Sequence, residues 1–140
     1  MVREGISLSA FKYAVLIFVY FLCICRIRDR EKLLKAAEKA CAKLWATYEK
    51  NGEGFPGTCS KEFKYELSEN TNWESGMYTG CYWLAYEITG DDFFKTIAEN
   101  HTESYKKRID EYIGMNDHDV GFVFTPSCVA QYKITGNEYA

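Results

Sequence analysis

Apolar residues recur every three or four positions along most of the chain, which predicts helices. The first such pattern runs from Asp29 to Lys50, with lysines and glutamates on its other face, and Asn51-Gly52 ends it. The second, around Met77–Ile88, is apolar nearly all round, so we expect that helix to be buried on most sides. The third, Asp92–Ile113, is one-sided and carries His101 on its apolar stripe, where a satisfied core histidine is expected.

Residues typical of turns and helix caps separate these patterns. Thr71 and Glu74 have the spacing of a capping box before the second helix, and Thr89-Gly90-Asp91 ends that helix and caps the third. Thr125-Pro126 has the chemistry of an N-cap followed by a first helical proline, which predicts that another helix starts there. A long loop is expected over Glu53–Asn70, although Phe63–Leu67 within it alternates briefly like a strand.

The chain contains an internal repeat. The stretch Tyr86–Asp91 returns as Tyr132–Asn137, 46 residues later, and Trp73 and Asp119 are separated by the same interval. Each unit reads as a loop, a mostly apolar helix, a Thr-Gly turn and a one-sided helix. This order predicts an all-α fold of helical-hairpin repeats, which stack into solenoids or close into toroids. In a closed ring, Trp73 and Asp119 would face one cavity from neighbouring hairpins.

The stretch Asp117–Phe122 is the strongest candidate for a site. It places two carboxylates and the imidazole of His118 within three residues, in a gap between two helical patterns. Polar chemistry in a short loop held by helices is typical of functional sites. The plainer interpretation is that Asp117 and Asp119 only cap turns.

Composition narrows the classes of function. Apolar residues make up 47% of the chain and aromatic residues 16%, which favours a folded chain whose aromatic rings serve either a core or a sugar-binding wall. The net charge is −3 and no basic run lies in the folded part, so no nucleic-acid partner is expected. The six cysteines form no C-x-x-C pair and there are only two histidines, so we expect neither a metal nor a cofactor.

Residues 1–28 read differently from the rest. Tyr13–Cys25 is an uninterrupted apolar run, shorter than the roughly 17–20 residues that span a bilayer. An uncleaved anchor, an atypical signal or an upstream mis-start are the three interpretations, and we place this tract outside a domain that comprises residues 29–140. A cytoplasmic location is favoured, with export or membrane anchoring through residues 13–25 as the alternative.

Three motifs resemble one known family. Asn70–Gly80, Trp83–Asp91 and Asp117–Phe122, together with Gly54-Phe55-Pro56, are similar to the unsaturated glucuronyl hydrolases, glycoside hydrolase family 88, from about Glu31 to Ala140. The resemblance implies the first part of an (α/α)6 barrel. It also implies hydration of the vinyl ether of a Δ4,5-unsaturated uronic acid at the non-reducing end of oligosaccharides left by polysaccharide lyases.

The resemblance also assigns roles to residues. Asp119 matches a catalytic aspartate, Trp73 matches an aromatic residue that lines the sugar site, and His118 is its neighbour on the same loop. Unsaturated uronic acid oligosaccharides are therefore the expected partners, with a membrane only if residues 13–25 form an anchor. Glu74, Met77 and Tyr78 depart from the family, which usually has Thr, Phe and Trp there, so linkage specificity is left open.

Length sets a further expectation. Six hairpins need on the order of 280 residues, so 140 residues correspond to an incomplete barrel, and the second catalytic aspartate is expected beyond Ala140. We therefore expect this stretch to be inactive by itself. Two alternatives remain, an unsaturated rhamnogalacturonyl hydrolase of the same fold and a non-catalytic helical-repeat scaffold that binds a partner.

Overall fold

The computed structural model describes residues 8–140, with side chains from residue 29 onward. The chain forms two units, one that ends at Lys39 and one that comprises Ala40–Ala140, and helix α1 (Leu8–Asn51) belongs to both. Within the described part, no helix is both long enough and apolar enough to cross a membrane. The interpretation of residues 13–25 as an anchor or a signal concerns side chains outside the described residues.

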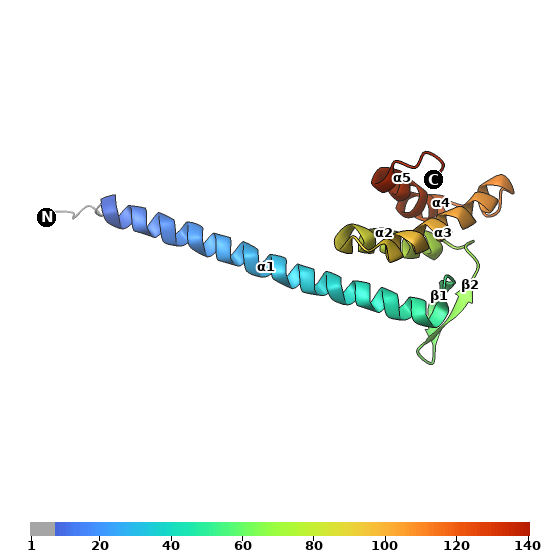
Figure 1. Ribbon diagram of the computed structural model, residues 1–140, viewed down its shortest axis with the longest axis horizontal. Coiled ribbons are helices and arrows are strands. Elements are labelled where there is room, and N and C mark those ends of the chain that lie inside the picture. The colour runs from blue at the N-terminus through green and yellow to red at the C-terminus, as the bar shows by residue number, and fades with distance from the viewer. Residues whose placement is uncertain (1–7) are drawn as a thin grey trace. The chain divides into compact units, whose positions relative to one another are not determined.

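The unit Ala40–Ala140 is mostly helical, as the sequence predicts. Helix α2 contacts strand β1 and each of the helical elements that follow it, so the core lies along this helix. The elements after α1 are β1 (Phe55–Lys61), β2 (Lys64–Ser68), α2 (Trp73–Thr89), α3 (Asp92–Asp110), α4 (Val120–Phe124), a π-helical turn η1 (Thr125–Val129) and α5 (Ala130–Thr135) (Figure 1).

Helix α1 starts far earlier than Asp29, so the predicted start is wrong. No Gly or Pro lies between Leu8 and Asn51, and nothing in the backbone interrupts the helix there. Its end is as predicted, because Gly52 adopts φ +59° and its N–H donates to the Tyr48 carbonyl at 2.7 Å. The domain boundary after residue 28 stays a prediction.

The expected long loop contains an antiparallel hairpin instead. Strand β2 coincides with the short alternating pattern, but β1 was missed because Pro56 and Gly57 are unfavourable in strands. The pairing shifts register between Pro56 and Ser60, which accommodates both residues in a strand of a two-stranded sheet. The hairpin carries buried Phe55 into the core next to α3.

The capping box before α2 does not form. The N-cap is Asn72 rather than Thr71 and makes no side-chain capping bond, so Glu74 stands at the second helical position, too early for its part in the box. Ser75 does not replace the cap, because its hydroxyl, 2.7 Å from the Asn72 carbonyl and 3.1 Å from the Asn70 carbonyl, donates to oxygen atoms and accepts nothing from the helix N–H groups. The helix then ends as predicted, at Thr89 with Gly90 at φ +69°.

The expectation that α2 is buried on most sides is wrong for this chain. One face is fully packed, with Tyr82, Trp83 and Ala85 inside the core. The opposite side exposes about half of the Met77 and Leu84 side chains, because the described elements cover only part of the helix circumference.

The third and fourth helices differ from their predicted limits. Helix α3 starts at Asp92 as predicted but ends at Asp110, before Tyr112 and Gly114 turn the chain with positive φ angles. Helix α4 begins at Val120, so a start at Thr125-Pro126 is wrong. Pro126 instead lies inside the helical run, where the wider π turn accommodates a residue that lacks an N–H and crowds the preceding turn.

Two glycines let α4 and η1 approach α2 closely. A Cβ at Gly76 would overlap the backbone of Val123 and Phe122, and one at Gly80 would lie 2.8 Å from Cβ of Pro126. Val123 is buried against this surface. The backbone contact at Gly76 therefore fixes the position of the segment that follows Asp119.

Replacing Gly76 by alanine should destabilise the protein strongly. Alanine favours a helix over glycine by roughly 1 kcal/mol, but the methyl group would meet backbone that cannot turn away, so we expect a net loss of at least about 2 kcal/mol. Urea unfolding of Gly76→Ala measures it. Gly121→Ala is the matched control, since no atom of the residues that the structure describes lies within 4 Å of its Cβ position, and it should be neutral or stabilising. Equal unfolding midpoints for the two variants would contradict the packing argument.

A buried polar network joins α2, α3 and the residues before β1. The Oγ1 atom of Thr79 lies 3.2 Å from Nδ1 of His101 and 3.1 Å from the Tyr105 hydroxyl, and Nε2 of His101 donates to the Glu53 carbonyl at 3.1 Å. Because a carbonyl only accepts, Nε2 carries the proton and Nδ1 accepts. The prediction that His101 is a satisfied core histidine is confirmed, and its burial lowers its pKa to about 4, although the hydrogen bond to Glu53 opposes that shift.

This lowered pKa makes stability depend on pH. The unfolded chain binds a proton at His101 near pH 6.5, whereas the folded chain binds it only near pH 4. Stability should therefore fall as the pH drops from 7 towards 4, with a contribution from His101 of up to about 3 kcal/mol. The free energy of unfolding at pH 7 and pH 5 measures this fall, and His101→Gln should remove the part due to His101.

The second histidine supplies the control for that experiment. His118 is the only other histidine in the chain and its side chain is 91% exposed. His118→Gln should leave in place the part of the pH dependence that is due to His101. A fall in stability that is equally steep in both variants would assign the effect to the carboxylates and not to His101.

Candidate active site

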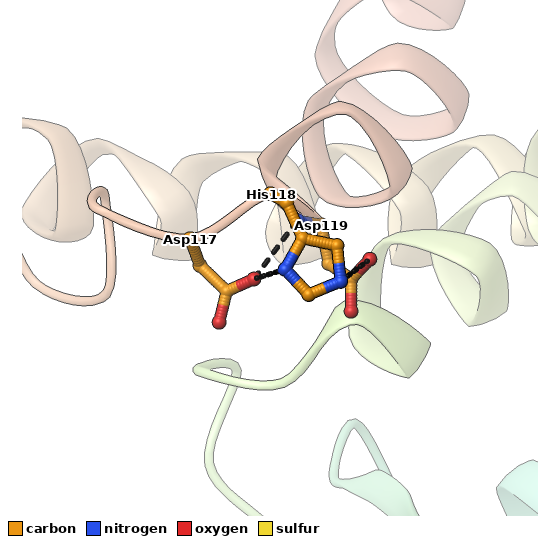
Figure 2. Close-up of side chains that lie close together, drawn as sticks. All are labelled: Asp117, His118 and Asp119. Atoms are coloured by element: carbon orange, nitrogen blue, oxygen red, sulfur yellow. Dashed lines mark hydrogen bonds and ion pairs between the residues drawn. The ribbon is translucent and has the colours of Figure 1, made fainter.

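The loop between α3 and α4 brings Asp117, His118 and Asp119 together. Figure 2 shows the His118 ring between the two carboxylates, with Nδ1 3.3 Å from Oδ1 of Asp117 and Nε2 3.4 Å from Oδ1 of Asp119. A neutral imidazole donates to only one of them, whereas the protonated ring can donate to both. Each ring nitrogen of His118 thus faces an oxygen of a different carboxylate.

The two aspartates play different structural roles. Oδ1 of Asp117 accepts the backbone N–H of Asp119 at 2.9 Å, so Asp117 caps the turn as the plainer interpretation expects. Asp119 stands at the N-cap of α4, yet its carboxylate makes no capping hydrogen bond, and only its carbonyl accepts, from Phe122 N–H at 2.8 Å. The turn therefore occupies the Asp117 carboxylate but not that of Asp119, whose side chain is 30% exposed.

An open cleft of about 500 Å³ lies beside the loop. Its walls are mainly apolar, and its residues are Met77, His118, Gly121, Phe122, Thr125 and Pro126. A cleft of this size and lining suits a small ligand with a flat apolar face. Pro126 and Thr125 reach it because the π turn η1 continues α4 without a break.

Trp73 reaches this region through Phe122. The two rings are 6.2 Å apart and inclined by 60°, and both side chains are about half exposed. Neither Trp73 nor Asp119 lines the cleft itself. Trp73 borders it through Phe122, and the Asp119 carboxylate borders it through the His118 ring.

Sequence reasoning named Trp73, His118 and Asp119 but missed the apolar floor. Met77, Phe122 and Pro126 form it, and Phe122 stands three residues after Asp119, a spacing that places both on one face of a helix. This spacing is the feature of the sequence that could have predicted Phe122 as part of the site. The side-chain N and O atoms of Asp117, His118 and Asp119 lie within 4.8 Å of one another, a separation that a cation could bridge, but the contacts of the His118 ring with both carboxylates already account for it.

The 46-residue repeat is reproduced in hydrogen bonds. The Gly90 N–H donates to the Tyr86 carbonyl at 2.7 Å and the Gly136 N–H to the Tyr132 carbonyl at 2.8 Å, with φ angles of 69° and 73°. The hydroxyl of Thr89 donates to Ala85, as that of Thr135 donates to Gln131.

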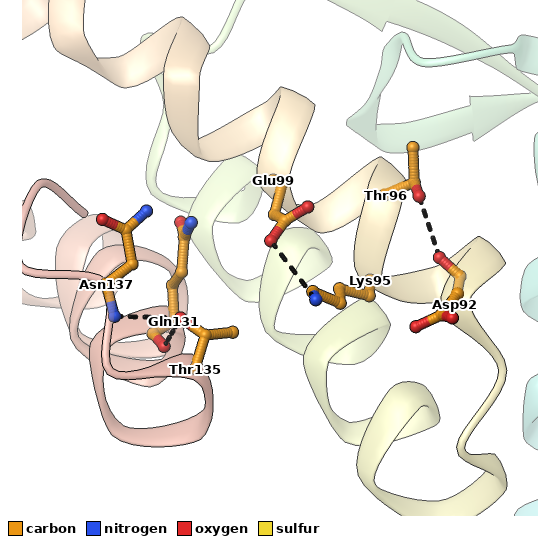
Figure 3. Close-up of polar contacts among 7 residues, drawn as sticks. All are labelled: Asp92, Lys95, Thr96, Glu99, Gln131, Thr135 and Asn137. Carbon is orange, nitrogen blue, oxygen red and sulfur yellow. Dashed lines mark hydrogen bonds and ion pairs between the residues drawn. The ribbon is translucent and has the colours of Figure 1, made fainter.

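The same correspondence continues past each turn. The N–H groups of Asp91 and Asn137 donate to those two threonine hydroxyls at 3.1 and 3.2 Å. Figure 3 shows the second set at Gln131, Thr135 and Asn137. The two turns are therefore equivalent, and each closes a helix that follows a site loop.

Known proteins are similar to this chain in sequence and in structure. No protein-family model matches the chain. An unsaturated chondroitin disaccharide hydrolase of Streptococcus agalactiae is 38% identical over 112 residues, which are 80% of this chain and 28% of that protein. An unsaturated glucuronyl hydrolase of Bacillus sp. GL1 is 35% identical over 91 residues, which are 65% of this chain and 24% of that protein.

Solved structures agree with these sequence matches. The crystal structure of unsaturated glucuronyl hydrolase from Streptococcus agalactiae matches with a TM-score of 0.70 and 39% identity, over 74% of this chain and 28% of that chain. An aspartate-to-asparagine variant of that enzyme, complexed with dGlcA-GalNAc6S, matches with a TM-score of 0.69 and 40% identity, over 74% and 27%.

The fold and the repeat define a class, the helical-hairpin proteins with an (α/α)6 barrel, of which this chain forms a portion. Within that class the chain belongs to the family of the unsaturated glucuronyl hydrolases, which are glycoside hydrolases. It spans about 28% of the length of the relatives that it matches.

Proposed function

We propose that the loop Asp117–Asp119, with Trp73 and Phe122, forms part of a site for Δ4,5-unsaturated uronic acid oligosaccharides. The observation that carries this proposal is the unequal use of the two aspartates, since the turn occupies Asp117 and leaves the Asp119 carboxylate without a capping bond. The named activities of the relatives and the sugar-bound structure support the class of substrate.

The proposed chemistry is hydration of the vinyl ether. Water adds across the double bond, a proton to C4 and hydroxyl to C5, and the resulting hemiketal opens and releases the next sugar. No glycosyl-enzyme intermediate is needed, unlike the usual two-carboxylate scheme. Asp119 acts as the carboxylate that orders the water and exchanges its proton, and the indole of Trp73 covers a face of the sugar.

His118 has a place in this scheme as a hydrogen-bonding neighbour. Its Nε2 faces Asp119 and its ring forms part of the cleft wall, so it can hold the carboxylate while contacting the substrate. Because Nδ1 faces Asp117, the same ring links the catalytic carboxylate to the residue that shapes the turn.

The test replaces Asp119 by asparagine in a protein of the relatives' length. We would exchange the matching segment of the Streptococcus agalactiae relative for residues 31–140 and follow the loss of ultraviolet absorbance of an unsaturated chondroitin disaccharide. Asp119→Asn keeps the shape but removes the charge, so turnover should fall roughly 10²–10⁴-fold with binding retained.

Asp117→Asn is the control for that experiment. The amide oxygen can still accept the Asp119 N–H, so the turn persists and the loss of turnover should be milder. Turnover of Asp119→Asn within a few-fold of the parent would reduce Asp119 to a turn residue and refute the assignment. Absence of both turnover and sugar binding in the parent chimera would favour a binding scaffold over an enzyme.

A further inference from the structure

Arg108, at the end of α3, is buried without an acidic partner among the described residues. Its side chain is 2% exposed, and its only polar contacts there are with main-chain carbonyls. An isolated buried cation is costly unless its hydrogen bonds are satisfied, so a guanidinium in this position needs an explanation. The neighbouring Lys107 is exposed and makes none of these contacts.

The three carbonyls belong to the two segments that lead into the candidate site. Nη1 donates to the carbonyl of Asn70 at 2.6 Å, just before α2 and Trp73. Nε donates to the carbonyl of Ile113 at 3.3 Å and Nη2 to that of Gly114 at 3.4 Å, just before Asp117. One planar side chain thus holds the start of each site segment.

The surroundings of the guanidinium are shaped to it. Its Cζ lies 5.8 Å from the ring centre of Phe124, at the end of α4. A Cβ at Gly114 would lie 3.1 Å from Nη2, which is a tight contact. Gly114 also has φ +62°, a backbone conformation that glycine adopts without strain. The contacts of Arg108 therefore reach a third site element, α4.

The two segments depend on Arg108 to different degrees. Asn70 is also held by its own side chain, which donates to Ser104 of α3 at 2.9 Å, and its carbonyl accepts from Ser75 as well. Among the described residues, the segment at Ile113 and Gly114 has, besides the Arg108 side chain, only the bond from the Ile113 N–H to the Arg108 carbonyl at 2.9 Å. Loss of the guanidinium should therefore loosen the second segment more.

We propose that Arg108 is a positioning residue for this site, whose fork of donors fixes the Asp117–Asp119 loop against the segment that carries Trp73. Its role in turnover rests on the proposed function, whereas its role in ordering the loop does not. Lysine keeps the charge but offers a single nitrogen, which cannot bond all three carbonyls in this geometry. Arg108→Lys therefore removes the planar set of guanidinium donors while it keeps the positive charge.

The first measurement is backbone ¹⁵N relaxation of the chain itself. In Arg108→Lys, the amides of residues 113–119 should gain motion on the picosecond-to-nanosecond timescale. The amides of Asp91 and Phe93 should stay ordered, because the Asp91 carboxylate caps α3 by accepting the Phe93 N–H at 2.9 Å, away from Arg108. Arg108→Met should behave alike, and Lys107→Met should match the parent. Should Arg108→Met fail to fold, Arg108→Lys decides alone. An ordered 113–119 segment in Arg108→Lys would overturn the proposal.

The second measurement is turnover of the unsaturated disaccharide by the chimera described above. Misplacing the Asp119 loop by about 1 Å should lower kcat roughly 10- to 100-fold in Arg108→Lys and leave Lys107→Met unchanged. Parent-like kcat in Arg108→Lys would overturn the positioning role. An inactive parent chimera would count against the proposed function alone, because the relaxation experiment still decides whether Arg108 orders the loop.

Discussion

The close backbone contact between α2 and α4 is the constraint on which the site depends. With no side chain at Gly76, the backbone of Val123 can lie directly against the helix, and the flat ring of Pro126 does the same at Gly80. This contact fixes where the chain leaves the loop at Asp119. The cleft beside it has an apolar floor because the same segment supplies Phe122.

The adjoining face of α2 is held by polar groups that bury one another. Thr79 bridges His101 and Tyr105 of α3, and His101 extends the network to the Glu53 carbonyl before the hairpin. Each of these groups has a partner, so the network fixes the orientation of α2 against α3 without leaving an uncompensated charge. The neutral form of His101 is part of that balance, since its burial disfavours the imidazolium.

The two repeat units share the chemistry of their turns and differ in the loops before their apolar helices. Their turns use the same Thr-Gly chemistry and nearly the same hydrogen-bond lengths, because a helix end closed by a left-handed glycine has few geometries. The loops before their apolar helices differ in chemistry, with an indole at Trp73 and a carboxylate at Asp119. A common scaffold thus presents two different groups to one region, linked by the contact between Trp73 and Phe122.

The sequence by itself determined the helical class, the 46-residue repeat, the turns at Gly90 and Gly136, and the candidate residues, because local periodicity and turn chemistry depend on near neighbours. Tertiary structure decided the rest. It moved the start of α4 to Val120, since packing at Gly76 outweighed the local signal of Thr125-Pro126. It also distinguished the two aspartates, because no local pattern shows which carboxylate a turn will occupy.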